Sequence, residues 1–486
     1  MNNTLFENLE PIAVWKYFGE ILQIPRPSKS EEKILAYIEQ FAINNNLEHK
    51  KDTIGNIVIK KPASPGRENQ NVVVLQSHVD MVCEKNSNVE HNFLTDPIKA
   101  VIDGNWIKAD GTTLGADNGI GVAAQLAVLA DKTLKHGPIE CLFTVDEETG
   151  LTGAKQMTAG FISGKVLLNL DSEDEGELFI GCAGGIDTTI QYPYIAVEPD
   201  RSLIAIKINI NGLLGGHSGD DINKGRANAI KLMARFLWDC INNFDIFLAS
   251  FQGGNLRNAI PREAESVILL HPAKLEAFKK YYRLYKSIIK NENKYSDKDI
   301  EIEFCEVDKP GSCLDKNDTR KLVGSLYACP NGVIAMSQAI EALVETSTNL
   351  ASVHFKDNST IEIVTSQRSS TESAKYDIAN RVACIFQLTG AKTKHGEGYP
   401  GWAPDAGSKV LKTAQDVYSR LFNTTPKVKA IHAGLECGLF LENNPGLDMV
   451  SFGPTLRNVH SPDERMEIES VEKFWKFLIA LLENIG

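Results

Sequence analysis

The stretch VVVLQSHVD at residues 72–80 decides the fold class of this chain. Four apolar residues, Val72 to Leu75, lead without interruption into a segment that contains His78 and Asp80. An unbroken apolar run of this length is typical of a strand that is buried on both faces of a parallel sheet. In open α/β sheets, functional residues lie beyond the carboxyl ends of such strands, so we expect both polar residues at a site.

Two further apolar runs also end in acidic residues. Ile139–Val145 leads into DEETG, which contains Glu147 and Glu148, and Val166–Leu170 leads into Asp171. Because the carboxyl ends of parallel strands meet at one edge of a sheet, these side chains are expected to converge on one crevice. The sequence therefore predicts an α/β catalytic domain with a mostly parallel central sheet flanked by helices.

The residue types at this edge favour a transition metal. Two imidazoles with three or more carboxylates suit zinc, manganese or cobalt, whereas an all-oxygen set would suggest magnesium or calcium. Pairs of metal ions about 3.5–4 Å apart, as in aminopeptidases and nucleases, need a shared carboxylate. Asp117 is the candidate for that bridge, because it lies in the glycine-rich stretch GTTLGADNGIG where a helix of small residues begins.

The adjacent acids Glu147 and Glu148 are predicted to differ in role. Neighbouring residues of an extended chain project in opposite directions, so the two are not expected to chelate one ion together. One can bind metal while the other accepts a proton from a metal-activated water and passes it to the leaving amine.

Five motifs, taken in their order along the chain, resemble those of the di-zinc exopeptidases of the aminoacylase and carboxypeptidase type, in particular the dipeptidases among them. The motifs are HVDMV, LGADNGIG, DEETGLTGA, NLDSED and RNVHSPDE. The resemblance extends from the N-terminal region to the last predicted helix. It implies a zinc-exopeptidase catalytic domain with an inserted α+β lid domain, and metal-dependent hydrolysis of dipeptides, including those with histidine in second position.

The resemblance also implies roles for individual residues. The expected ligands of two zinc ions per chain, for which Co²⁺ or Mn²⁺ can substitute, are His78, Asp117 and Asp171 for one ion and Asp117, Glu148 and His460 for the other. Glu147 becomes the general acid and base, and Asp80 the carboxylate that orients the imidazole of a ligand. The peptide bond between Asp117 and Asn118 is cis in such proteins.

Further residues are candidates for contacts with the substrate. They are His217 in LGGHSGDD, Asn258 in GGNLRNAIP, Arg368 in VTSQRSS, and Gly434 and Glu436 in HAGLECG. A dipeptidase must recognise a free carboxylate one residue beyond the cleaved bond, and the planar guanidinium of Arg368 can bind it through two hydrogen bonds. By resemblance, His217 helps to stabilise the tetrahedral oxyanion, Asn258 contacts the substrate through its amide, and Gly434 and Glu436 border the substrate.

Each interpretation has an alternative. His217 can belong simply to a glycine-rich turn, Arg368 to a structural ion pair, and Asn258 can cap a turn before Pro261. The whole protein can instead be an N-acyl amino acid deacylase or a tripeptidase of the same fold, or a non-catalytic binding or scaffold protein that kept the fold. An acidic contact for a free α-amine would favour the dipeptidase, and an apolar acyl pocket the deacylase.

The metal motifs stop at Asp171 and resume at His460, and the segment between them is patterned as a domain. We expect a discontinuous catalytic domain, residues 1–186 and 398–486, with the lid domain at 187–397. In the lid we expect strands at 203–210, 264–270, 299–307, 350–355 and 361–365, and helices at 227–240, 274–290, 332–345 and 373–388. This order suggests two βαβ-like halves. Relatives with a small insertion dimerise through it and those with a doubled one carry an internal mimic of the partner, so the oligomeric state, a homodimer included, stays open.

Composition limits the partners. The 486 residues carry a formal net charge of −12 and no basic stripe, which disfavours nucleic acid. The N-terminus lacks a basic region followed by an apolar one, and no stretch reaches membrane-spanning length. The nine cysteines include no C-x-x-C pair, so a disulfide framework is not expected. We therefore expect a cytoplasmic protein of at least two domains that acts on small dipeptides, without nucleic acid or membrane partners.

Overall fold

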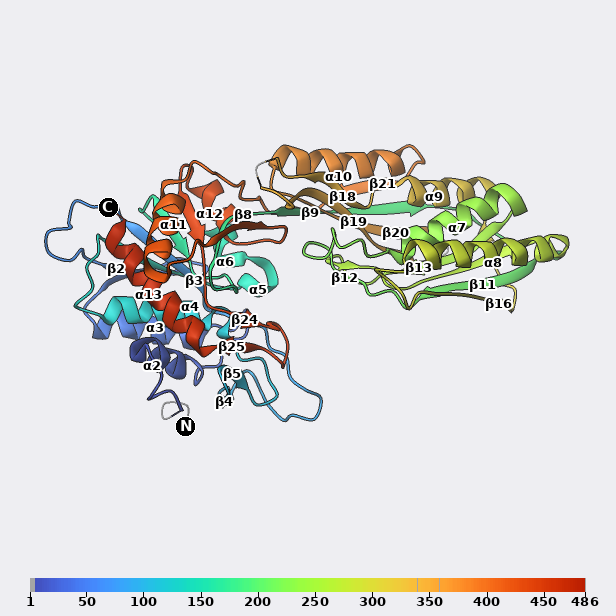
Figure 1. The fold of residues 1–486 in the computed structure, drawn as a ribbon. Coiled ribbons are helices and arrows are strands. Elements are labelled where there is room, and N and C mark those ends of the chain that lie inside the picture. The colour runs from blue at the N-terminus through green and yellow to red at the C-terminus, as the bar shows by residue number, and fades with distance from the viewer. Residues whose placement is uncertain (1–4, 339, 358, 486) are drawn as a thin grey trace. The chain divides into compact units, whose positions relative to one another are not determined.

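The structure is a computed structural model that describes residues 5–338, 340–357 and 359–485. The chain divides into two compact units, and most of their helices and many of their strands are labelled in Figure 1. Unit 1 comprises Met1–Gly181, Trp402–Ala430 and Leu435–Gly486, and unit 2 comprises Cys182–Gly401 and Ile431–Gly434.

Unit 1 is built on an eight-stranded sheet in the order β1-β2-β6-β3-β7-β23-β8-β22. The four central strands β6, β3, β7 and β23 run parallel, and β2 and β8 join them antiparallel. Every residue of β3 and β6 is buried, as expected for strands covered on both faces. The predicted parallel sheet is thus confirmed at its centre. The strands are β1 (Glu48–Lys51), β2 (Ile57–Lys61), β3 (Val73–His78), β6 (Ile139–Thr144), β7 (Val166–Asn169), β8 (Glu177–Cys182), β22 (Lys427–Ile431) and β23 (Asp448–Ser451).

Helices and a small second sheet complete unit 1. Helix α4 contacts both α2 and β3, and its alanine and glycine residues allow this close approach. Both ends of the described chain belong to this unit (Figure 1). The helices are α2 (Ile12–Ile21), α3 (Glu32–Asn44), α4 (Ala116–Ala130), α5 (Glu147–Gly150), α6 (Thr152–Gln156), α11 (Lys409–Phe422), α12 (Cys437–Asn443) and α13 (Ile468–Asn484). The small sheet has the order β24 (Leu456–Arg457), β25 (Arg465–Glu467), β5 (Trp106–Ala109) and β4 (Ala100–Asp103).

Unit 2 contains a nine-stranded antiparallel sheet in the order β16-β11-β15-β13-β19-β20-β9-β21, with β18 also paired to β19. Its strands are β9 (Gly184–Pro193), β11 (Ile204–Asn211), β13 (Phe247–Gly253), β15 (Ala264–Leu270), β16 (Glu301–Val307), β18 (Gly332–Met336), β19 (Val344–Phe355), β20 (Thr360–Ser369) and β21 (Lys392–His395). Its helices are α7 (Ala229–Phe244), η1 (Pro272–Lys274), α8 (Leu275–Glu292), α9 (Lys316–Ala328) and α10 (Glu372–Gln387). Two short pairs, β10 (Ala196–Val197) with β17 (Cys313–Leu314) and β12 (Gly216–His217) with β14 (Ala259–Ile260), lie outside the sheet.

The unit 2 sheet consists of two ferredoxin-like halves. The elements β11, α7, β13, β15, α8 and β16 follow one another as β-α-β-β-α-β, and their strands pair in the order β16-β11-β15-β13. The elements β9, α9, β19, β20, α10 and β21 repeat this pattern in the order β21-β9-β20-β19. The first half is therefore inserted into the second, between β9 and α9. The two βαβ-like halves of the sequence prediction correspond to these two halves of the sheet. In each half, the two parallel strands joined by a helix are separated by an antiparallel strand.

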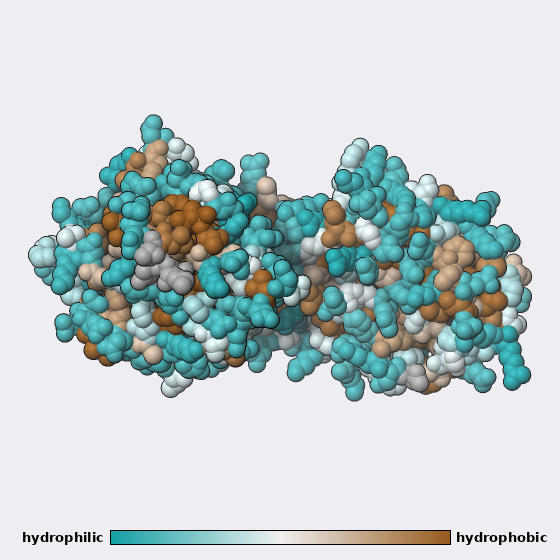
Figure 2. Space-filling model, turned by 90° about the horizontal axis from the view of Figure 1, so that it is seen from below, coloured by the Kyte–Doolittle hydropathy of each residue, from teal (hydrophilic) through white to brown (hydrophobic). Residues whose placement is uncertain are grey.

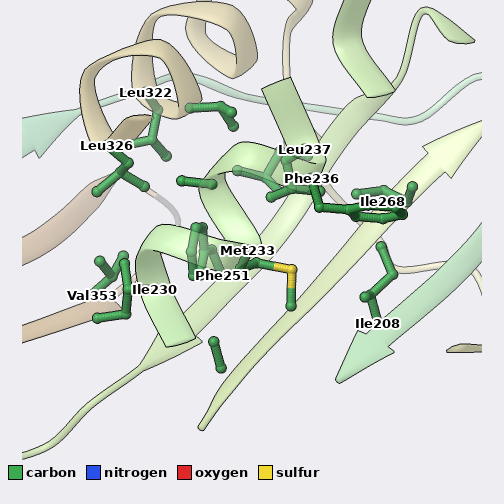
Figure 3. Close-up of a cluster of buried hydrophobic side chains, with 14 of the residues drawn as sticks. Ile208, Ile230, Met233, Phe236, Leu237, Phe251, Ile268, Leu322, Leu326 and Val353 are labelled. Carbon is green, nitrogen blue, oxygen red and sulfur yellow. The ribbon is translucent and has the colours of Figure 1, made fainter. Parts of the chain in front are cut away.

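Apolar side chains of the helices fill the space over the unit 2 sheet. Figure 3 shows Phe236 and Met233 of α7 close to Ile208 of β11 and Ile268 of β15. All four belong to one buried cluster, and burial of this apolar area drives the packing. On the face seen in Figure 2, the surface is mainly hydrophilic with a few apolar patches. Among the described residues, none of the helices combines the length and apolar character that crossing a membrane requires.

One predicted helix of the insertion is wrong, and one helix was missed. Residues 332–345 were expected to be helical, but Gly332–Met336 forms β18 and Val344 begins β19; residue 339 lies outside the described part. The helix of this region is α9, Lys316–Ala328, which Asp315 caps by accepting a hydrogen bond from Asp318 N at 2.7 Å. The isolated apolar residues of 332–345 satisfied helical spacing, but edge pairing with β19 decides the conformation.

Candidate active site

The candidate metal ligands stand at the ends of strands of unit 1. His78 is the last residue of β3, Asp171 follows β7 by two residues, and Glu148 lies in the first turn of α5 after β6. Asp117 lies in the first turn of α4, where its peptide bond to Asn118 is cis, as the resemblance implies. His460 lies in the loop between β24 and β25. Five residues from five segments thus come together in one unit.

These residues form two groups that share Asp117. His78, Asp117 and Asp171 make one group and Asp117, Glu148 and His460 the other, and within each group the ligand atoms lie within 4.8 Å of one another. The two oxygens of Asp117 face different histidines: Oδ1 is 3.1 Å from His78 Nε2, and Oδ2 is 3.1 Å from His460 Nε2. A carboxylate in this arrangement can bridge two cations.

The donor distances fit metal coordination. His78 Nε2 is 3.3 Å from Asp171 Oδ1, and His460 Nε2 is 3.0 Å from Glu148 Oε2. Zinc bonds of about 2.0–2.1 Å at tetrahedral angles separate neighbouring ligand atoms by about 3.3 Å. In addition, the buried Oε1 of Glu148 has no hydrogen-bond partner. The set of imidazole and carboxylate groups therefore fits a pair of transition-metal ions.

The electrostatics of the cluster point to the same need for positive charge. Burial, with the neighbouring Asp117 and Glu148, raises the pKa of Asp171 to about 6. Burial, followed by Asp171 and Glu148, raises the pKa of Glu147 well above its ordinary value. Carboxylates this close oppose each other's ionisation unless cations lie among them.

Glu147 and Glu148 do not lie in extended chain, which corrects the reasoning from the sequence. Both belong to the first turn of α5, after Asp146, whose φ of 49° turns the chain sharply. Atoms of the two glutamates come within 4.8 Å of His78 as a group. The alternation argument therefore does not separate the two acids. What distinguishes them is the 3.0 Å contact of Glu148 with His460.

Asp80 contacts the cluster through His78 and through the turn that carries Glu147 and Glu148. Its side chain is fully buried, its Oδ1 lies 3.3 Å from His78 Nδ1, and its Oδ2 accepts a hydrogen bond from Ser28 Oγ at 2.7 Å. It also accepts from the backbone N–H groups of Glu147 at 3.1 Å and Glu148 at 3.2 Å. Burial opposes ionisation, but these hydrogen bonds hold the pKa of Asp80 below its ordinary value. One carboxylate thus orients both an imidazole and the turn that carries the two acids.

Two buried residues that support the Asp117 loop were missed in the sequence. Glu464 is 2% exposed and accepts hydrogen bonds from the N–H groups of Leu114 at 2.7 Å, Gly115 at 2.9 Å and Ala116 at 2.8 Å, with a longer contact of 3.3 Å to Asp117 N. The guanidinium of Arg26 donates to Asp80 O at 2.8 Å and to the carbonyl of Gly115. The only signal for Glu464 is its place in RNVHSPDE, four residues after His460.

Two further acids lie near the cluster. Glu436, a candidate for contact with the substrate, is fully buried in unit 1, where it accepts hydrogen bonds from Gln76 Nε2 at 2.6 Å and Thr144 Oγ1 at 2.8 Å. Burial raises its pKa to about 8. Glu173, which was missed, has its pKa raised to about 8, first by burial and then by Asp117.

The candidates of the middle segment lie in unit 2, where His217 contacts Arg368. Arg368 lies on β20 with 8% exposure; its Nη1 donates to the hydroxyl of Tyr399 at 3.1 Å, and its Nη2 lies 3.4 Å from His217 Nε2. The His217 Nδ1 is 3.1 Å from Asp220 Oδ2. A guanidinium can only donate, so Nε2 is the acceptor in this contact, and the Nδ1 of His217 in turn accepts from the backbone N–H of Asp220 at 3.2 Å. His432, also buried, contacts Ser347 Oγ through Nε2 at 2.7 Å.

The remaining candidates of unit 2 are Asn258 and Gly434. The side chain of Asn258 is exposed and has no hydrogen bond within the described chain, while its carbonyl accepts from Ser218 N at 2.8 Å. Asn258 thus adjoins the β12–β14 pair that carries His217, but it is not in the Arg368 group. Gly434 lies against the ring of Tyr399. Tyr399 itself was missed, since a lone tyrosine in GEGYPGW carries no spacing signal.

Known proteins resemble this chain along its whole length. The profile of peptidase family M20/M25/M40 matches residues 74–484. The sequence is 44% identical over 477 residues, 98% of each chain, to the cytosol non-specific dipeptidase of Escherichia coli strain K12. The crystal structure of aminoacylhistidine dipeptidase from Vibrio alginolyticus matches with a TM-score of 0.92 and 43% identity over 99% of this chain and 98% of that one. A tripeptidase from Staphylococcus aureus, at 17% identity, 98% and 99% coverage and a TM-score of 0.56, shares the fold.

Proposed function

The chain belongs to peptidase family M20/M25/M40, and from this membership we propose that it is a zinc-dependent dipeptidase. Its relatives at 44% and 43% identity are dipeptidases by name. The observation that carries the mechanism is the pair of ligand groups sharing Asp117, with Glu147 beside them.

The residues proposed to hold two zinc ions are His78, Asp117 and Asp171 for one, and Asp117, Glu148 and His460 for the other. When bound, such a pair lowers the pKa of a water molecule toward about 7 and polarises the peptide carbonyl. Asp80 keeps the His78 ring oriented through its contact with Nδ1.

Glu147 is proposed as the general base and acid. Its carboxylate accepts a proton from the attacking water and delivers it to the nitrogen of the leaving amine. Glu148 contacts His460 and belongs to a ligand group that shares Asp117, which supports a metal-binding role for Glu148 and leaves Glu147 for proton transfer.

Arg368 is proposed to bind the C-terminal carboxylate of the dipeptide, and His217 to stabilise the oxyanion. An oxyanion needs a donor, but the Nε2 of His217 lies where it accepts from Arg368. The proposed role therefore requires hydrogen on Nε2, and the 3.2 Å hydrogen bond from the Asp220 N–H to Nδ1 supports that tautomer.

The alternatives receive less support. The two relatives above 40% identity are dipeptidases by name, whereas the tripeptidase that covers as much of the chain is only 17% identical. A non-catalytic protein would have no reason to keep five ligand-type residues and Glu147 together. One relative is named for the cytosol, and we propose the same compartment here.

A panel of dipeptides, free and N-blocked, assayed with zinc, cobalt and manganese tests the proposal. Free dipeptides should be hydrolysed, the N-blocked ones poorly, and a chelator should abolish turnover until metal is returned. Metal content measured beside the assay should approach two ions per chain. Full activity of a demonstrably metal-free sample, or hydrolysis confined to N-acyl amino acids, would contradict the proposed function.

A further inference from the structure

Arg368 is a buried cation without an anionic partner. Its side chain is 8% exposed, and its contacts are with two groups that carry no negative charge, the Tyr399 hydroxyl and the His217 imidazole. Its Nε has no hydrogen-bond partner, and within the described ranges it forms no ion pair with an aspartate or glutamate. An unpaired buried charge is costly, so this site is suited to an anion from outside the protein.

Tyr399 is held beside Arg368 by its backbone. Its N–H donates to Gly185 O at 2.8 Å, and its carbonyl accepts from Gly185 N at 3.1 Å and from Lys375 Nζ at 2.7 Å. Lys375 is only 1% exposed, and the chain thus places a buried ammonium group on this carbonyl. These backbone contacts therefore hold Tyr399 in place independently of the contacts of its side chain.

Two glycines make room for the hydroxyl end of the ring. A β-carbon at Gly185 would lie 2.7 Å from the Tyr399 hydroxyl oxygen, and one at Gly434 would lie 2.9 Å from Cε2 and 3.2 Å from the hydroxyl. A side chain at either position would push the ring away from Arg368. The sequence associated Gly434 with the substrate, and its place against Tyr399 gives that association a physical basis.

We propose that Tyr399 is a second donor to the C-terminal carboxylate of the substrate, beside Arg368, which rests on the proposed dipeptidase function. Arg368 already donates to the phenolic oxygen, so the hydroxyl hydrogen is left for an acceptor outside the protein. Burial raises the pKa of Tyr399, which keeps this hydrogen in place at neutral pH. One carboxylate oxygen then accepts from the guanidinium and the other from the hydroxyl.

The test is Tyr399→Phe, which removes the hydroxyl and keeps the ring. KM for a free dipeptide should rise about 10- to 100-fold, the factor expected for one hydrogen bond to a charged group. The value of kcat should change little, because the contact is made in the ground state and the transition state alike. Inhibition by the free amino acid product should weaken by a similar factor, and inhibition by its amide should not change.

Tyr295→Phe is the matched control, because this tyrosine of unit 2 is 89% exposed, and it should leave KM unchanged. Gly434→Ala, which displaces the hydroxyl, should raise KM in the same direction as Tyr399→Phe. A Tyr399→Phe enzyme with native KM and native product inhibition would overturn the proposal and leave the dipeptidase function standing. Absence of any dipeptide hydrolysis by the native enzyme would instead overturn the proposed function.

Discussion

The candidate clusters of the two units carry unbalanced charge of opposite sign. In unit 1, Asp117, Glu148 and Asp171 crowd together with two histidines, an excess of negative charge that suits cations. In unit 2, the buried guanidinium of Arg368 contacts a hydroxyl and an imidazole and has no carboxylate partner among the described residues, which suits an anion. The difference teaches that the side chains of one unit suit metal ions and those of the other suit a carboxylate, and the variants proposed for each unit test these two expectations.

The largest effect is expected at the pair of glutamates in unit 1. Glu147→Gln should lower kcat by about 10²–10⁴ while the metal content stays near native, because only proton transfer is lost. Glu148→Gln is the matched variant and should lose metal, since its carboxylate contacts His460. Steady-state kinetics with metal analysis on both proteins would show a reversed assignment if Glu147→Gln lost metal and Glu148→Gln kept it.

The anionic side of the comparison is tested at Arg368. Arg368→Ala should raise KM for free dipeptides about 30- to 1000-fold, because truncation leaves the substrate carboxylate unpaired in a buried site. Arg368→Lys should give a KM between those of the native enzyme and Arg368→Ala, since lysine keeps the positive charge but loses the planar guanidinium that forms two hydrogen bonds. Arg201→Ala, at an exposed arginine of the same unit, is the control. Equal hydrolysis of a dipeptide and its C-terminal amide by the native enzyme would remove Arg368 from this role.

A smaller effect is expected at Glu464, which holds the Asp117 loop. Glu464→Gln replaces one of two acceptor oxygens by an amide that faces backbone N–H groups. Metal affinity should fall about 10- to 100-fold, the usual scale for residues that orient ligands. Competition with a chromogenic chelator measures it, and Asp463→Asn, at the exposed neighbouring acid, is the control. If Glu464→Gln bound metal with native affinity, the hydrogen bonds between Glu464 and the Asp117 loop would not matter to the metal site.

The smallest effect is expected on the free energy of unfolding, through the buried His432 near Arg368. Burial, and then Arg368, lowers the pKa of His432 from 6.5 to about 4. Below pH 6.5 the unfolded chain binds a proton that the folded chain does not, so stability present at higher pH is lost as pH falls toward 4. Between pH 7 and 5 the loss is about 2 kcal/mol.

His432→Asn should remove this part of the pH dependence, as read from urea unfolding of metal-stripped protein at both pH values. His354→Asn, at a half-buried histidine of β19, is the control. If the unfolding free energies of native protein and His432→Asn changed in parallel with pH, His432 would not be held neutral in the fold.

The sequence predicted the parts of the molecule in which one residue pattern has one physical outcome. Apolar runs ending in His78 and Asp171 predicted parallel strands, and β3 and β7 are such strands. The resemblance of five motifs predicted a dipeptidase of this family, which the relatives confirm. The roles of the individual site residues stay predictions, although the five proposed ligands converge in unit 1.

Errors arose where local pattern does not determine structure. The spacing of apolar residues in 332–345 fits a helix, yet pairing along β19 makes Gly332–Met336 a strand. The reasoning about Glu147 and Glu148 assumed extended chain, but Asp146 at φ 49° begins a helical turn. In both cases a neighbour in space or a single backbone angle outweighed the local propensity.

By itself, the sequence determined how strands and ligand-type residues follow one another along the chain in unit 1, and which chemistry these residues can support. This was possible because each such residue directly follows, or lies in, the strand or loop that carries it. Only the tertiary structure decided which groups meet from distant segments. Glu464 reaches the Asp117 loop across more than 340 residues, and Tyr399 reaches Arg368 because Gly185 and Gly434 leave room for its hydroxyl. Such contacts depend on packing between segments with no common period, and no spacing along the chain encodes them.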